Sequence, residues 1–218
     1  MRSSWYFPAA ALALALALGS AVAAHPHAPE TRLHPMERQL QVAMTIDRLL
    51  KLGRAEQDAQ ALVEAARLSR RYEVSLLSAE SEVAHPVELS RQWLEEAESM
   101  AARGGQVRLQ RMIREAMAEA DKGITPFAIV RILDLGPRGQ ARLRARAEGG
   151  EPTIIGASSD GTLQIALDVR GAGESAPRCT SSGELTLVCR LEIAREEYLT
   201  ISLANRSRYS GTAYVISN

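Results

Sequence analysis

The spacing of apolar residues changes between the two halves of this 218-residue chain. Between residues 35 and 122 apolar residues recur every three to four positions, which is typical of amphipathic helices. From residue 125 onward they alternate with polar residues, which is the period of a half-buried strand. No single regular element satisfies both periods. We therefore predict an α+β fold with segregated parts: a helical domain over residues 35–122 and an antiparallel, jelly-roll-like β-sandwich over residues 123–218.

Four helices are expected in the first half, separated by glycine and proline signals. The first begins at Pro35 and ends at Gly53, and the second begins near Ala55. The third and fourth are predicted at residues 87–103 and 106–121, and residues 72–84 are expected to form a short helical turn and a loop. Short connections favour a small antiparallel bundle or two helical hairpins. The second and third helices also share alanine-rich stretches, so a tetratricopeptide-like hairpin is an alternative.

Seven short alternating segments in the second half predict strands, and glycine-rich turn signals separate them. They are residues 127–133, 140–146, 153–156, 163–169, 185–189, 198–203 and 212–216. This number and spacing of short strands is typical of an antiparallel sandwich.

The chain has two cysteines, Cys179 and Cys189. A hairpin that turns near Ser182 and Gly183 would bring their Cβ atoms within bridging distance, so we predict a structural disulfide. A redox-active pair is the alternative, but the spacing is not C-x-x-C, and no helix follows that would lower a thiol pKa.

The first 24 residues have the three parts of a secretory leader. Arg2 supplies the positive charge, an alanine- and leucine-rich run follows, and small residues end the segment. The apolar run is shorter than the ~20 residues needed to span a bilayer. Cleavage after Ala23 or Ala24 fits, and we favour Ala24. The prediction is a cleaved signal peptide over residues 1–24, a flexible tail over residues 25–34, a periplasmic or secreted location in a bacterium, and no membrane span after cleavage.

The charge balance limits the classes of partner. The chain has 26 basic and 26 acidic residues. Binding to nucleic acid requires an excess of basic charge, and so does adhesion to anionic membranes. We therefore expect neither, and we expect another envelope or secreted protein as the partner.

The second half resembles the bacterial pre-peptidase C-terminal domain. Residues 148–161 are similar to the second hairpin of that family, and residues 198–218 are similar to its last hairpin. The resemblance implies a non-catalytic sandwich module of secreted proteins. The family often has an acidic run in its middle strands, but only one acid, Asp168, remains over residues 161–168. Asp160 and Asp168 therefore lack an obvious third oxygen ligand for calcium. Peptidase motifs of the H-E-x-x-H and G-x-S-x-G types are absent, and no cofactor is expected.

Two sets of polar residues each have a functional interpretation and a simpler, structural one. Cleavage after Ala24 would make His25 the N-terminus, and His25 and His27 are candidate copper ligands with His34 or His85 as a second ligand. Pro26 removes a backbone nitrogen, which favours a polar tail. His85, Glu88 and Ser90 lie at a helix start, where they act as caps more often than as a catalytic set.

Trp93 and the arginines Arg142, Arg144 and Arg146 are candidate interaction residues. The arginines occupy every second position, so they lie on one face of a strand. Such a charged row is also typical of the solvent-exposed face of a sandwich. The sequence predicts a non-enzymatic interaction protein. The alternatives are an enzyme or metal-binding protein with a site at the helix–sandwich boundary, and a structural subunit of an envelope assembly.

Overall fold

Four helices occupy the first half of the chain, close to the positions that the apolar period predicts. The structure, a computed structural model, describes residues 35–78, 81–118, 127–183 and 186–217. The helices are α1 (Pro35–Glu56), α2 (Ala59–Tyr72), α3 (Pro86–Arg103) and α4 (Val107–Ala118). The predicted signal peptide, the tail at residues 25–34 and the boundary between residues 122 and 123 lie outside the described residues.

The sequence analysis predicted that the first helix ends at Gly53, but α1 continues to Glu56. A Cβ atom on Gly53 would lie 2.8 Å from Leu62 Cδ2, so this glycine allows α2 to approach α1 closely. Gln57 ends the helix with a positive φ of 55°. Asp58 then caps α2, where its side chain accepts hydrogen bonds from the amides of Gln60 and Ala61. The second helix therefore begins at Ala59 and not near Ala55.

A strand that the sequence analysis missed lies between the helices. Strand β1 (Val74–Ser78) was expected to be part of a helical turn and loop, but it pairs in parallel with β2 (Ala128–Leu135). Its first four residues are all buried, so the period-two alternation that identifies a half-exposed strand is missing. Its partner lies about fifty positions away, and no local signal indicates such a pairing. The helical and strand parts are therefore not fully segregated along the chain.

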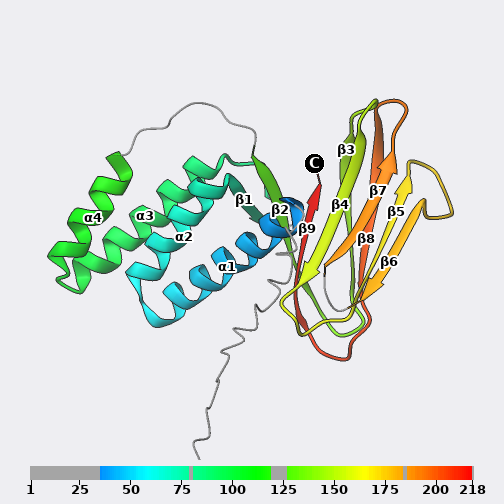
Figure 1. Cartoon of the computed structure of the whole chain (residues 1–218). Coiled ribbons are helices and arrows are strands. Elements are labelled where there is room, and N and C mark those ends of the chain that lie inside the picture. Colours follow the sequence, from blue (N-terminus) through cyan, green and yellow to red (C-terminus); the bar gives the residue numbers. More distant parts are fainter. Residues whose placement is uncertain (1–34, 79–80, 119–126, 184–185, 218) are drawn as a thin grey trace, which may run out of the picture. The chain divides into compact units, whose positions relative to one another are not determined.

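The strands form two sheets in the described part of the chain. The five-stranded sheet has the order β1-β2-β9-β4-β7, and the four-stranded sheet has the order β3-β8-β5-β6. The remaining strands are β3 (Gln140–Ala147), β4 (Pro152–Ser159), β5 (Ile165–Gly171), β6 (Cys179–Gly183), β7 (Leu187–Glu192), β8 (Glu197–Asn205) and β9 (Gly211–Ser217). Helices followed by a β-sandwich confirm the predicted α+β class (Figure 1).

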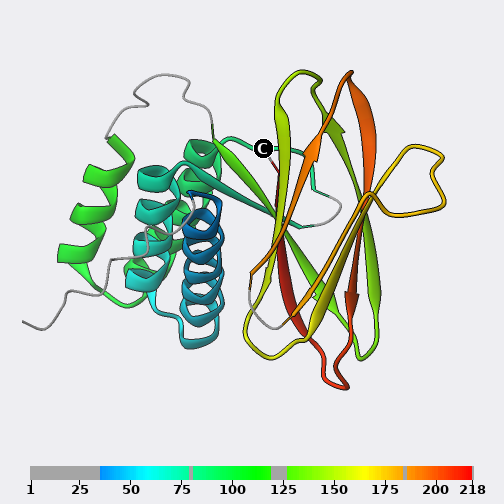
Figure 2. The same cartoon turned by 45° about the vertical axis from the view of Figure 1, so that its right-hand side comes forward.

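Helix α1 covers the outer face of the five-stranded sheet, against β9 and β4 (Figure 2). Tyr214 and Ile216 of β9 belong to the same core cluster as Leu40 and Ile46 of α1. On β4, Gly156 makes this contact close, because a Cβ atom there would lie 2.5 Å from Met36 Sδ. The sheet therefore contributes to two hydrophobic cores, one shared with the helices and one inside the sandwich.

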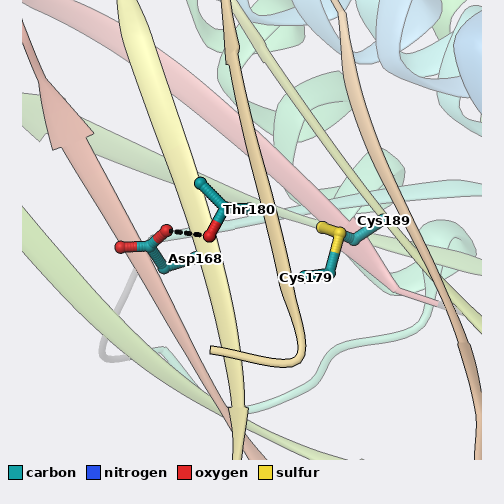
Figure 3. Close-up of a disulfide and its surroundings, with 4 residues drawn as sticks. All are labelled: Asp168, Cys179, Thr180 and Cys189. Carbon is teal, nitrogen blue, oxygen red and sulfur yellow. Dashed lines mark hydrogen bonds between the residues drawn. A yellow bond between two sulfur atoms is a disulfide. The ribbon is translucent and has the colours of Figure 1, made fainter. Parts of the chain in front are cut away.

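The disulfide between Cys179 and Cys189 is formed, with a Cα–Cα distance of 5.9 Å (Figure 3). The predicted hairpin between the cysteines is wrong, because Cys179 begins β6 and Cys189 lies in β7. These are edge strands of different sheets, so the disulfide joins one sheet to the other. The polar residues after Cys179 were expected to form a turn, but they form β6, which pairs with β5. Asp168 accepts a hydrogen bond from the Thr180 hydroxyl at 2.9 Å across this pair.

Candidate interaction groove at the sandwich edge

Strands β2 and β3 follow one another in the chain but belong to different sheets. A tight turn joins them, in which the Gly139 amide donates to the Gly136 carbonyl at 2.9 Å. Before this turn β2 pairs with β9, and after it β3 pairs with β8. A groove of about 840 Å³ lies between the two sheets here, and the first turns of α1 line one end of it. The lining includes both apolar residues from the sandwich interior and arginines.

The apolar part of the groove is an incompletely covered section of the sandwich core. On β8 the inward residues Leu199, Ile201 and Leu203 are at most 2% exposed. The inward residues of β3 are only half-buried, although they pack against the same core. They are Ala141, Leu143 and Ala145. Two of them are alanines, and β3 is an edge strand with no strand beyond it among the described residues, so the sandwich interior reaches the surface at this edge.

The backbone of β3 presents a defined set of hydrogen-bonding groups at this edge. The Asn205 amide donates to the Gly139 carbonyl at 2.9 Å, which makes these two residues a hydrogen-bonded pair of the antiparallel ladder. The register from Gln140 to Ala147 is continuous, so odd-numbered residues of β3 bond to β8. Even-numbered residues therefore direct their N–H and C=O groups to the open edge. These are Arg142, Arg144 and Arg146, together with Gln140.

The three arginines predicted as interaction residues lie side by side on the outer face of β3, and each is exposed. Arg146 pairs with Glu196 at 2.8 Å, and its hydrogen bond lowers the pKa of that carboxyl. The Arg144 guanidinium lies 4.0 Å from the centroid of the Tyr198 ring. Arg142 makes no hydrogen bond or ion pair with any described residue. Two of the three guanidinium groups therefore lack a carboxylate partner in the described part of the chain.

A second, smaller hollow of about 350 Å³ adjoins the arginines on the outer face of the four-stranded sheet. Arg142 lines both this hollow and the groove. Its lining includes the hydroxyl groups of Thr200 and Ser202. It also includes two more arginines, Arg170 and Arg206, and two carboxylates, Asp168 and Glu174. The outer face beside β3 is thus polar and contains charges of both signs, whereas β3 contributes apolar residues, among them Ala141, Leu143 and Ala145, to the sandwich core.

A polar network occupies the boundary between α1 and the sandwich, where the alternative enzyme or metal site was predicted. The Tyr214 hydroxyl donates to Asp47 at 2.6 Å, and Lys51 pairs with the same carboxylate at 2.8 Å. Lys51 also donates to the Thr212 hydroxyl, which donates to Asp134 at 3.0 Å. The sequence analysis assigned no role to Asp47, which lies among the buried apolar residues of α1. A carboxylate at a buried helix position was the sequence signal that could have indicated this network.

Tyr214 should make the protein less stable at alkaline pH. Burial raises the pKa of this phenol, and the hydrogen bond to Asp47 raises it further. The unfolded chain ionises Tyr214 above its ordinary pKa of about 10, whereas the folded protein retains the proton. The contribution of this group is therefore fully present below pH 10 and is lost as the pH rises further. Urea unfolding at pH 8 and pH 10.5 should show a smaller alkaline loss for Tyr214→Phe than for the wild type. Tyr209→Phe, at an exposed tyrosine, is the control and should leave that loss unchanged.

The remaining candidate residues have structural contacts where the structure describes them. Trp93 is 6% exposed and lies in the core of the helices, so its own chain covers the indole. His85 caps α3 by accepting from the Val87 amide, and Ser90 is fully buried and bonds to the Val87 carbonyl. Ser90 also accepts a hydrogen bond from Arg70. His25, His27 and His34 lie outside the described residues.

The described ranges contain no group of three or more His, Cys, Asp or Glu side chains that could hold a metal ion. Burial acts to raise the pKa of Asp160, but hydrogen bonds from Thr162 and the Thr212 amide outweigh it and lower the pKa. Among the helices described, none is both long and apolar enough to cross a membrane.

No protein-family model and no curated protein sequence matches this chain. Several solved structures are similar to its second half. The pre-peptidase C-terminal domain of a collagenase from Bacillus anthracis is 5% identical, with a TM-score of 0.34, over 41% of this chain and 87% of that domain. The predicted resemblance to this domain is therefore found among solved structures.

Two other similar structures come from bacteria. A mitogen from Yersinia pseudotuberculosis is 12% identical, with a TM-score of 0.35, over 43% of this chain and 86% of that protein. A periplasmic inhibitor of g-type lysozyme from Aeromonas hydrophila is 10% identical, with a TM-score of 0.33, over 46% of this chain and 93% of the inhibitor. Similarities at this level carry no information about the function of this chain.

Proposed function

We propose that this protein is an exported, non-catalytic interaction protein that binds another protein through the groove between β2, β9 and β3. The observation that carries the proposal is the half-buried apolar row of β3, with arginines on the other face of the same strand. An apolar surface beside polar and charged groups is typical of protein-binding sites. A partner that covered the groove would complete the burial of Leu143 and Ala145.

Two features support export. The first 24 residues have the pattern of a secretory leader, and the chain has a disulfide between its two cysteines. Disulfides form and persist in the periplasm and outside the cell, whereas cytosolic thiols are kept reduced. A periplasmic or secreted location therefore fits both features.

The test is site-specific photo-cross-linking in living cells. A benzophenone-bearing residue at Ala145 should give one reproducible adduct, whose partner is identified by mass spectrometry. The same residue at Leu52, an exposed position on α1, is the matched control and should not give this adduct. The proposal fails if the Ala145 position gives no adduct that the Leu52 position lacks.

An enzyme or metal-binding role at the helix–sandwich boundary remains the second candidate, because Asp47, Lys51 and Tyr214 meet there. These groups are already paired with one another, which favours a structural role. A stoichiometric metal in freshly purified protein, lost in Asp47→Asn, would favour the second candidate over the first.

A further inference from the structure

We propose that the partner binds by adding an extended, acidic strand to the open edge of β3, with an acidic residue at every second position. This inference rests on the proposed function and specifies the chemistry of the partner. It follows from the direction of the backbone groups of β3, the charge on its outer face and the apolar row on its inner face.

The backbone of β3 can accept such a strand. Arg142, Arg144 and Arg146 direct their N–H and C=O groups to the open edge, as the ladder with β8 requires. An added antiparallel strand would exchange two hydrogen bonds with each of these residues. Main-chain hydrogen bonds of this kind supply much of the affinity when a peptide extends a sheet.

The side chains define which strand fits. In an antiparallel pair, residues directly opposite each other have side chains on the same face, with Cβ atoms about 4.5–5.5 Å apart. The residues opposite the three arginines would therefore share the arginine face. Carboxylates there would pair with the guanidinium groups of Arg142 and Arg144, which have no carboxylate partner among the described residues. The intervening residues would point to the inner face and cover Leu143 and Ala145, so small apolar side chains suit them.

Two other possible occupants of this edge, a second copy of the chain and the tail at residues 25–34, fit less well. A second copy of this chain, pairing through its own β3, would place arginines opposite arginines, and like charges directly opposite destabilise a sheet. The tail at residues 25–34 contains two prolines and one acidic residue. Proline cannot donate to a ladder, so this tail does not have the required pattern.

The probe is a seven-residue peptide, acetyl-Thr-Glu-Val-Glu-Val-Glu-Thr-amide, with a fluorescent label. Its three glutamates match the spacing of the three arginines. Binding to the full mature protein is measured by fluorescence anisotropy at low ionic strength, because salt screens exposed charges. We expect saturable binding that weakens as salt is added. The Arg142→Glu/Arg144→Glu double variant should bind at least tenfold more weakly, because two attractive pairs become repulsive. Arg190→Glu, an exposed arginine on the edge strand of the other sheet, is the matched control and should bind as the wild type does.

N-methylated peptides separate strand addition from charge attraction alone. Methyl groups on the glutamate amides would remove the N–H groups that face β3, and binding should be lost. Methyl groups on the valine amides face away from β3 and should leave binding largely intact. Equal binding by the two methylated peptides would overturn the proposal, since attraction between side chains does not depend on the backbone.

Amide hydrogen exchange by NMR provides a residue-level readout in the unmodified protein. The amides of Arg142, Arg144 and Arg146 should exchange more slowly when the peptide is bound, whereas those of Leu143 and Ala145 already bond to β8 and should change less. Binding without protection of the arginine amides would overturn the inference, and so would a stable dimer of the protein alone at the same edge. If the Ala145 cross-link then still forms, the proposed function stands and only the mode of binding is wrong.

Discussion

Replacing Asp47 with alanine is expected to lower the free energy of unfolding by about 3 kcal/mol. Asp47 is 6% exposed and Tyr214 is 1% exposed, so the variant leaves a buried phenol without an acceptor. The carboxylate also pairs with Lys51, and this second contact is lost as well. Because Asp47 lies on α1 and Tyr214 on β9, the substitution weakens the attachment of the helices to the sheet. Urea unfolding at pH 7 measures the loss.

Two control variants identify the source of the effect. Asp47→Asn keeps an acceptor for the Tyr214 hydroxyl and should lose less stability than Asp47→Ala. Lys51→Ala removes the ion pair with Asp47 and the hydrogen bond to the Thr212 hydroxyl, but the lysine is largely exposed, so the variant should cost no more than about 1 kcal/mol. A loss within 0.5 kcal/mol of zero for Asp47→Ala, which is roughly the range of surface substitutions, would show that this hydrogen bond does not hold α1 on the sheet.

Removal of the disulfide is the second change with a large expected effect. The two cysteines are separated by 10 positions, and a closed loop of this size stabilises a fold by about 3 kcal/mol in the chain-entropy description. The Cys179→Ala/Cys189→Ala variant should lose about this amount. The largest local loss of stability should occur in β6, which is largely exposed and pairs with β5 alone among the described strands. Denaturant unfolding gives the global loss, and faster amide exchange in β6 would locate it.

Reduced wild-type protein provides an independent comparison. Reduction breaks the same bond without changing a side chain in the core, where Cys189 is fully buried. The reduced protein and the double variant should therefore unfold at similar urea concentrations. A loss below about 1 kcal/mol in both would mean that the inter-sheet bond is not needed to hold β6 against the sandwich.

The arginine row on β3 has a second physical interpretation that the peptide experiments address. Charged residues on an edge strand also protect a sheet from pairing with other chains. If Arg142 and Arg144 serve only this purpose, replacing them with glutamate leaves the edge equally charged and protected, and no acidic strand binds the wild type. The inward row of Ala141, Leu143 and Ala145 favours a binding role, because protection alone does not require a half-exposed apolar groove.

Much of the fold could be predicted from the sequence, since the relevant signals were local. The helix period located α1 to α4 within a few residues, and the alternation of apolar residues located seven of the strands. The two missed strands show where local signals fail. Strand β1 is buried throughout and lacks alternation, and β6 is polar and mostly exposed, so neither has the pattern of a half-buried strand.

The candidate site was predictable only in part. The alternation of arginines with apolar residues predicted that Arg142, Arg144 and Arg146 lie on one face of a strand, and the structure has them there. That β3 is an edge strand could not be predicted, because it depends on which strands pair with β3. The same holds for Asp47, whose partner Tyr214 lies 167 positions away.

The sequence by itself determined the type and approximate bounds of most elements and which face of each is apolar, because these depend on neighbours within a few positions. Only the tertiary structure decided which strands pair and how α1 lies on the sheet. It also decided that the disulfide joins two sheets and that the sandwich core is open beside β3. Each of these depends on contacts between segments far apart in the chain. Such contacts are stabilised by the burial of apolar side chains, which cannot be predicted from a short stretch of sequence.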